Sequence, residues 1–114
     1  MVKHDAEYYN ADCPITYTIS ILEGKWKWLI IWVLEEEGII RYGELKRNLP
    51  KITHKMLSQQ LKELEKMELI SRKSYHQIPP KVEYSLTGKG KTLLPIIDLM
   101  CEWGEKNCPK KTGV

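Results

Sequence analysis

The segment from residue 53 to residue 66 combines apolar, basic and hydrogen-bonding side chains at a helical spacing. With about 100° between successive residues, Leu57, Leu61 and Leu64 fall in one narrow sector, which we expect to face the core. The opposite sector, about 60° wide, carries four polar side chains: Lys55, Gln59, Lys62 and Lys66. Lysine binds phosphate as a point charge, and the glutamine amide pairs with the major-groove edge of adenine. The pattern is therefore typical of a helix that binds duplex DNA, and also of an ordinary solvated surface helix.

Several positions on and around this helix have the chemistry to contact DNA. The first turns of a DNA-reading helix enter the major groove, so we expect base contacts from four residues: His54, Lys55, Ser58 and Gln59. Lys62 and Lys66 follow them and are expected to contact phosphates. A basic hairpin beside the helix, and the residue before the preceding short helix, would bind the DNA backbone on either side of one groove. These additional expected contacts are Arg41, Lys73, Gln77 and Lys81.

The positive charge is concentrated in the middle of the chain. The 114 residues carry a net charge of +3, but residues 41–91 hold twelve Lys or Arg against five Glu, an excess of +7. Residues 1–40 carry −4, and residues 92–114 are neutral overall. Such a segment has the electrostatic signature of a surface that meets an anionic polymer. A basic face without a partner would have the same charge, so charge alone does not decide.

Composition and length indicate one globular domain spanning residues 1–114. Hydrophobic residues make up 42% and charged residues 29% of the chain, a mixture that supports a core and argues against disorder. The longest apolar run, residues 28–34, is far shorter than the roughly 20 residues of a membrane-spanning helix. The polar N-terminus predicts no secretory signal, so we expect a cytoplasmic protein. The cysteines, at positions 13, 101 and 108, have no CxxC spacing and predict reduced thiols.

Apolar spacing and capping signals predict the order helix, helix, strand, helix, helix, strand, strand, helix. After a polar arm at residues 1–12, the first expected elements are a helix from Pro14 to about residue 22, a helix at 25–37, a strand at 39–41 and a helix at 43–48. The N-cap Thr53 then begins a helix that runs to about Glu68. Strands at 69–76 and 81–86 surround a hairpin tip at 78–80. Thr87 caps a last helix, which Pro95 should kink.

A helix pair followed by a two-stranded hairpin predicts a helix-turn-helix with a wing. The fold class is therefore mainly α with a small antiparallel β wing, an α+β arrangement. The helix at 25–37 is apolar all round, because three tryptophans and five aliphatic residues leave its middle without a polar face. Such a helix must be covered on every side, which in so small a domain suggests that a second chain helps to cover it.

The chain lacks the residue patterns of common enzyme classes. Its histidines, at positions 4, 54 and 76, have no Cys or His partner at metal-ligand spacing. Gly88 and Gly90 precede a helix without the Lys-Ser/Thr ending of a phosphate-binding loop. No local motif provides a base beside a cysteine. We therefore expect no enzymatic activity, no metal and no cofactor.

Five runs of the sequence occur in a familiar order: Cys13-Pro14, Gly24-Lys25-Trp26, Arg41–Leu45, Lys55–Leu64 and Pro79–Thr87. Together they resemble the HxlR family of bacterial transcriptional regulators, within the MarR-like superfamily. The resemblance extends from Cys13 to Trp103. Its departures are small, with Glu23 in place of a common glycine and Tyr42 in place of a common phenylalanine.

The resemblance implies a winged helix-turn-helix homodimer that binds operator DNA and regulates transcription. In that arrangement residues 13–37 and 88–107 form the core and the dimerisation helices, and residues 41–87 form the helix-turn-helix and the wing. The implied interface residues are Ile15, Ile19, Leu22, Ile97, Met100 and Trp103. Two-fold symmetry predicts an inverted-repeat operator whose half-sites lie about one helical turn, or a multiple of it, apart.

Regulation is suggested by two further features. Some family members sense oxidants or electrophiles through an N-terminal cysteine, and Cys13 occupies the matching position. A thiol at a helix N-terminus ionises more readily and is more reactive, whereas a small buried cysteine that only packs is the simpler interpretation. Trp26, Trp28 and Trp32 could line a small-molecule pocket beside the dimerisation helices, although large aromatic residues usually form plain core.

A second class of function remains compatible with the sequence. A winged helix could serve as a protein–protein interaction module, with its basic helix and wing against a protein and no specific DNA binding. The stripe of four polar residues on the helix from Thr53 distinguishes the two functions, because substitutions there impair DNA binding only in a DNA-binding regulator.

Overall fold

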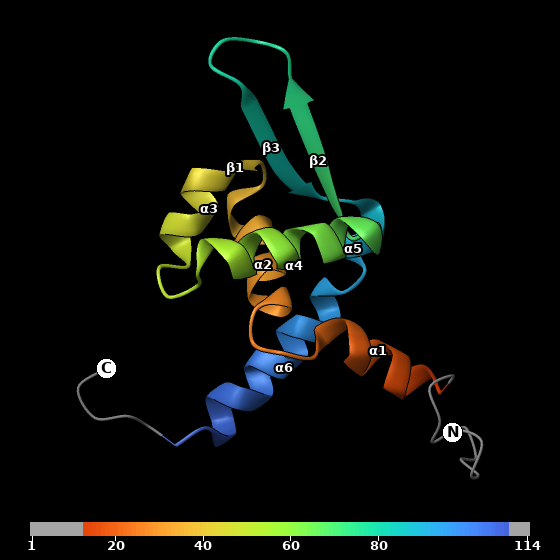
Figure 1. Ribbon diagram of the computed structural model, residues 1–114. Helices are drawn as coiled ribbons and strands as arrows, with labels where there is room; N and C mark the ends of the chain where they lie inside the picture. Colours follow the sequence, from red (N-terminus) through yellow and green to blue (C-terminus); the bar gives the residue numbers. More distant parts are fainter. Residues whose placement is uncertain (1–12, 110–114) are drawn as a thin grey trace.

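The computed structural model describes residues 13–109, which form six helices and a three-stranded antiparallel sheet (Figure 1). The helices are α1 (Pro14–Leu22), α2 (Lys27–Glu37), α3 (Tyr42–Asn48), α4 (His54–Lys66), α5 (Gly88–Lys91) and α6 (Leu94–Asn107). The strands are β1 (Ile40–Arg41), β2 (Ile70–Tyr75) and β3 (Lys81–Leu86). The fold is the winged helix-turn-helix that the sequence predicts, with the β2–β3 hairpin as its wing. The polar arm predicted at residues 1–12 lies outside the described residues.

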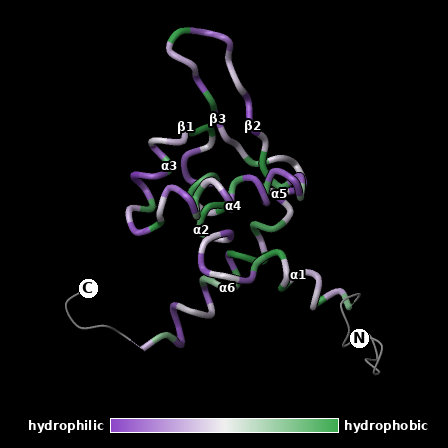
Figure 2. The backbone as a smooth tube through the Cα atoms, in the orientation of Figure 1, coloured by the Kyte–Doolittle hydropathy of each residue, from purple (hydrophilic) through white to green (hydrophobic). Residues whose placement is uncertain are grey.

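The apolar helix α2 forms the centre of the core. Ile30, Ile31 and Leu34 are fully buried, and Figure 2 shows hydrophobic segments along α2 and the neighbouring part of α6. The helix ends at Glu37, and its C-cap Gly38 has a φ of 77°, in the region that glycine adopts without strain. Its first residue, Lys27, is also buried, and the Lys27 Nζ lies 3.4 Å from a carboxylate oxygen of Glu63, which joins α2 to α4.

α3 and α4 form the helix-turn-helix. The Glu44 carboxylate accepts a hydrogen bond of 3.3 Å from the backbone N–H of Arg41, which fixes the start of α3. Thr53 is the N-cap of α4, as the sequence predicts, and its hydroxyl accepts a hydrogen bond of 3.1 Å from the Met56 N–H. The three leucines of the predicted apolar stripe are buried, so the opposite side of α4 faces solvent.

The sheet has the strand order β1-β3-β2, and both pairs are antiparallel. Tyr84 of β3 is the register partner of Arg72 of β2, and both side chains lie on the face that α4 packs against, which we call the inner face. The next position pairs Glu83 with Arg41 and with Lys73. Because successive side chains alternate along a strand, these three lie on the opposite, outer face.

Two helix predictions are corrected by the structure. The helix predicted from Thr53 to Glu68 ends at Lys66, and Glu68 has a left-handed φ of 62° where the chain turns into β2. The predicted last helix is divided into α5 and α6 instead of being one kinked helix. Pro95 lies in the first turn of α6, where a residue needs no partner for its backbone N–H, so the proline begins a helix and does not kink one.

α1 and α6 lie at the end of the molecule far from the wing (Figure 1). They carry large exposed apolar side chains: Ile15, Tyr17, Ile19, Ile96, Leu99, Met100 and Trp103. Apolar groups gathered in this way at one end of a small domain mark an interaction surface. No helix within residues 13–109 is both long enough and apolar enough to cross a membrane.

Gly90 of α5 has no room for a side chain, because an added Cβ would collide with the backbone carbonyl oxygen of Leu69. We expect Gly90→Ala to destabilise the fold by about 2 kcal/mol or more, since α5 must move away from the start of β2. The matched control is Gly104→Ala in α6, where an added Cβ meets nothing within 4 Å and helix propensity predicts a gain of up to about 1 kcal/mol. Urea unfolding compares the two variants, and equal stabilities would contradict the close approach.

Candidate nucleic-acid interface

The polar side of α4 is exposed along the helix. The predicted stripe of Lys55, Gln59, Lys62 and Lys66 occupies solvent-exposed positions, and so does His54. Within residues 13–109, none of the three lysines of this stripe takes part in a salt bridge. Their charges therefore remain free to bind phosphates.

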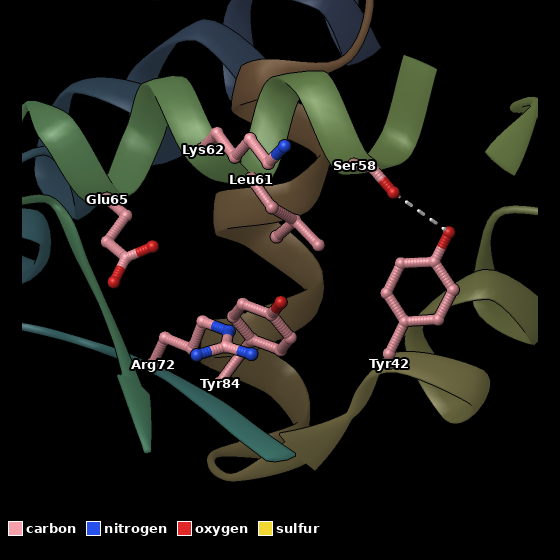
Figure 3. Close-up of a pocket in the computed structure, with 7 residues that line it drawn as sticks. All are labelled: Tyr42, Ser58, Leu61, Lys62, Glu65, Arg72 and Tyr84. Atoms are coloured by element: carbon pink, nitrogen blue, oxygen red, sulfur yellow. Dashed lines mark hydrogen bonds between the residues drawn. The ribbon is translucent and has the colours of Figure 1, made fainter. Parts of the chain in front are cut away.

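A hollow of about 380 Å³ lies between α4 and the wing (Figure 3). Ser58, Lys62 and Glu65 line it from α4, and Arg72 and Tyr84 line it from the inner face of the sheet. Figure 3 shows the Arg72 side chain lying beside the Tyr84 ring, and Arg72 itself is exposed. A phosphate that reaches this hollow would meet the guanidinium of Arg72 and the ammonium group of Lys62, with the carboxylate of Glu65 as the one opposing charge in the lining.

Tyr42, the first residue of α3, contacts the beginning of α4 from the side. Its hydroxyl oxygen lies 3.0 Å from Nδ1 of His54 and 3.5 Å from Oγ of Ser58, and the dashed line in Figure 3 marks the second contact. The Tyr42 and His54 rings are stacked, with centroids 5.8 Å apart and an interplanar angle of 18°. Two of the predicted base-reading residues are therefore held by a side chain from the preceding helix.

Sequence reasoning missed Tyr42 and Arg72 as members of this surface. No pattern in the sequence indicates that Tyr42 contacts a helix twelve residues further along. Arg72 had a usable signal, because the hairpin register pairs it with buried Tyr84 and so places it on the inner face. The sequence predicts its neighbour Lys73 instead, which lies on the outer face. Gln77 is exposed in the hairpin tip.

The outer face of the sheet carries the other predicted phosphate contacts, which are Lys73, Lys81 and Arg41. They lie around Tyr75 and Glu83. The ammonium groups of Lys73 and Lys81 lie 5.0 Å and 4.6 Å from the Tyr75 ring centroid. The Tyr75 hydroxyl donates to Glu83 at 2.7 Å, and the Lys81 Nζ lies 3.4 Å from the same carboxylate. The hydrogen bond from Tyr75 holds the pKa of Glu83 below its usual value. Burial raises this pKa, whereas the positive charges of Lys81 and Arg41 lower it further. Glu83 therefore neutralises part of this cluster's charge.

The six residues implied for a dimer interface differ in how far they are exposed. Leu22 is half-buried, and four residues are exposed: Ile15, Ile19, Met100 and Trp103. Ile97, the sixth of these residues, is only 4% exposed and packs in the core of its own chain. This side of α6 faces α2, so Ile97 has almost no surface to offer a second copy.

Two of the cysteines differ in how readily they ionise. Cys13 is the N-cap residue of α1 and is only 2% exposed. Burial raises the pKa of its thiol, but the nearby backbone N–H groups of Thr16 and Ile15 and the Thr16 hydroxyl outweigh burial and hold the pKa below its ordinary value. The pKa of Cys101 is raised by burial and by the Glu105 carboxylate, which accepts from its thiol at 3.6 Å. The Cys13 thiol therefore ionises more readily than the Cys101 thiol.

An apolar pocket of about 260 Å³ lies between α2 and α6. Its lining residues are Trp28, Trp32, Ile97, Met100, Cys101 and Gly104. Trp26, which the sequence also predicts there, is not among them and packs against the core. A lining without charged groups would accept an uncharged small molecule. In the described part of the chain, no three His, Cys, Asp or Glu residues are grouped so that they could hold a metal ion.

The chain has a helix-turn-helix whose second helix displays unpaired lysines beside a wing. These features define the class of winged helix-turn-helix DNA-binding proteins. Comparison with known proteins agrees with this class. Residues 21–112 match the profile of the HxlR-like helix-turn-helix family, and the chain belongs to that family.

Similar proteins include regulators with known structures. A regulatory protein of Fusobacterium mortiferum named MalR is 61% identical over 95 residues, which cover 83% of this chain and 90% of MalR. The oxidised form of the redox regulator HypR is 46% identical with a TM-score of 0.78, covering 86% of this chain and 100% of HypR. The reduced form of the transcriptional regulator YodB from Bacillus subtilis is 38% identical with a TM-score of 0.74, covering 84% of this chain and 94% of YodB.

The family and the geometry together establish the general function. The protein is a DNA-binding transcriptional regulator, as the sequence predicts. Further relatives are likewise named as helix-turn-helix transcriptional regulators.

Arg72→Ala should weaken binding to every duplex, because the Arg72 guanidinium is placed to contact a phosphate and not a base edge. We expect a several-fold loss of affinity and a plot of log K against log salt that is less steep by about one unit. Lys106→Ala removes the same charge from α6 and should change neither quantity. Fluorescence anisotropy across a salt series measures both. An unchanged slope for Arg72→Ala would show that the hollow does not bind phosphate.

Proposed function

We propose that this regulator binds an inverted-repeat operator as a homodimer, with the α4 helix of each copy in a major groove. The observation that carries the proposal is the separation of two surfaces. The unpaired lysines of α4 lie beside the wing, whereas the exposed apolar residues of α1 and α6 lie at the end far from the wing (Figure 1). A second copy that covers the apolar end would leave both α4 helices exposed to DNA.

Within each half-site, different parts of the surface have different tasks. We assign base reading to the first two turns of α4, where His54 and Ser58 are held by Tyr42 and Gln59 is exposed. Phosphate binding falls to the later lysines of α4 and to Arg72 in the hollow. This division follows the common arrangement in which phosphate contacts position the protein and base contacts provide specificity.

Lys62→Ala and Gln59→Ala should separate these two tasks. Loss of Lys62 removes a phosphate contact, so binding to all duplexes should weaken and the salt dependence should become shallower by about one unit. Loss of Gln59 should reduce the preference for the operator over a scrambled duplex by about 1–3 kcal/mol, the contribution of one paired base contact. Anisotropy measurements with a duplex from upstream of the protein's own gene, and with its scrambled counterpart, distinguish the two effects.

The outcome that would overturn this assignment is normal DNA binding by both variants. In that case α4 would not be the reading helix, and the basic surface would serve a protein partner.

Trp103→Glu should disrupt the proposed dimer. Trp103 is 69% exposed on α6, so the substitution costs the isolated fold little, but it would bury an unpaired charge between two copies. We expect sedimentation to show monomers at concentrations where the wild type is dimeric, and operator affinity to fall at least about tenfold. Asp98→Lys, which inverts an exposed charge on a different side of α6, is the control and should remain dimeric. A dimeric Trp103→Glu protein would place the interface elsewhere.

An oxidant acting on Cys13 is the regulatory signal that we infer. The lowered pKa increases the thiolate fraction at neutral pH, and the low exposure restricts access to small oxidants. Two structures with this fold, HypR and YodB, were determined in named redox states. Because Cys13 begins α1, which carries part of the proposed interface, its oxidation would alter the spacing of the two α4 helices.

Cys13→Ser should remove the response of DNA binding to hydrogen peroxide. We expect peroxide to change operator affinity several-fold for the wild type and for Cys108→Ser, which alters an exposed thiol, but not for Cys13→Ser. The reaction of the Cys13 thiol with peroxide should remain fast at pH values where an ordinary thiol is protonated. Its rate should fall only as the pH drops through the lowered pKa of Cys13. Anisotropy after timed peroxide exposure measures both. A response that survives in Cys13→Ser would exclude this thiol as the sensor.

A further inference from the structure

The Tyr42 hydroxyl is surrounded by polar atoms from the N-terminal turns of α4. It lies 3.0 Å from Nδ1 of His54, 3.3 Å from the His54 carbonyl oxygen and 3.5 Å from Oγ of Ser58. Figure 3 shows the ring reaching from the start of α3 towards Ser58. A hydroxyl has one proton to donate and can also accept a hydrogen bond, so the choice of acceptor decides the state of the neighbouring groups.

The geometry favours Nδ1 of His54 as the acceptor of that proton. The distance to Nδ1 is the shortest of the three. The His54 carbonyl oxygen keeps a second lone pair besides the one used within α4 and competes for the same proton, but its distance of 3.3 Å is longer. Ser58 can in turn donate its hydroxyl proton to the Tyr42 oxygen, which uses the remaining capacity of both groups.

This hydrogen bond determines which ring nitrogen of His54 carries the proton. A neutral imidazole whose Nδ1 accepts a hydrogen bond carries its proton on Nε2. The stacked Tyr42 ring, with centroids 5.8 Å apart and planes 18° apart, keeps the imidazole in this orientation. The exposed side of His54 then presents an N–H donor and no acceptor.

We propose that Tyr42 is a positioning residue for specificity, whose hydroxyl makes His54 a hydrogen-bond donor towards the major groove. In the groove, guanine offers two acceptors, whereas cytosine offers only a donor. His54 should therefore favour guanine and reject cytosine at the base that it faces. The inference rests on the DNA-reading role proposed above for α4 and adds a chemical rule for one position.

Tyr42→Phe tests the rule, because it removes one oxygen and leaves the aromatic ring. The probes are the duplex that the wild type selects from a randomised pool and its single-base variants. We expect the variant to lose about tenfold of the discrimination against cytosine at one position of each half-site, while the salt dependence stays unchanged. The control is Tyr75→Phe, which removes a hydroxyl hydrogen bond to Glu83 on the outer face and should keep full discrimination.

A spectroscopic measurement on the free wild-type protein tests the tautomer without DNA. The ¹⁵N shifts of His54, recorded at about pH 8 where an ordinary imidazole is neutral, should show a proton on Nε2 in the wild type and a mixture of tautomers in Tyr42→Phe. A proton on Nδ1 in the wild type would overturn the proposal, and so would full cytosine discrimination by Tyr42→Phe. If the wild type selects no sequence from the pool, it is the proposed operator binding that fails, and a proton on Nε2 would still support Tyr42 as the group that sets the tautomer.

Discussion

The burial of three leucines on one side of α4 is the constraint on which the DNA-binding surface depends. Leu57, Leu61 and Leu64 are almost completely buried, and each side chain of this size contributes about 1.5–3 kcal/mol when it leaves water. Because side chains repeat every 3.6 residues, this burial fixes the rotation of α4 about its axis. A rotation that turned Lys62 inward would expose a leucine and bury an unpaired charge. The orientation of the basic stripe is therefore a consequence of the core.

The alternation of side chains along β2 likewise fixes which side chains of the wing face α4. Arg72 shares the inner face with buried Tyr84 and completes the hollow beside α4, whereas Lys73 points to the outer face. There, Glu83 offsets part of the positive charge and accepts a hydrogen bond from Tyr75. The inner face of the wing is thus suited to bind phosphate, whereas the cations of the outer face already contact Glu83 and Tyr75. Net charge alone does not reveal this difference.

The sequence predicts the features that depend on local patterns and misses those that depend on contacts between elements. The N-cap Thr53, the buried stripe of α4 and the wing strands follow from capping signals and periodicity, and all are confirmed. Ile97 fits the apolar pattern of a dimerisation helix, yet only the packing of α6 on α2 shows that it faces its own core. The contact from Tyr42 to His54 joins two helices through a turn whose geometry no residue pattern specifies.

The most direct test of the DNA-binding surface is a set of backbone amide NMR spectra recorded while a duplex from upstream of the protein's own gene is added. We expect the largest chemical-shift changes in the first two turns of α4 and at Arg72 on the inner face of the wing. The amides of α6, at the far end of the molecule, should change little. Changes confined to the outer face around Glu83, or to α6, would contradict the placement of DNA against α4.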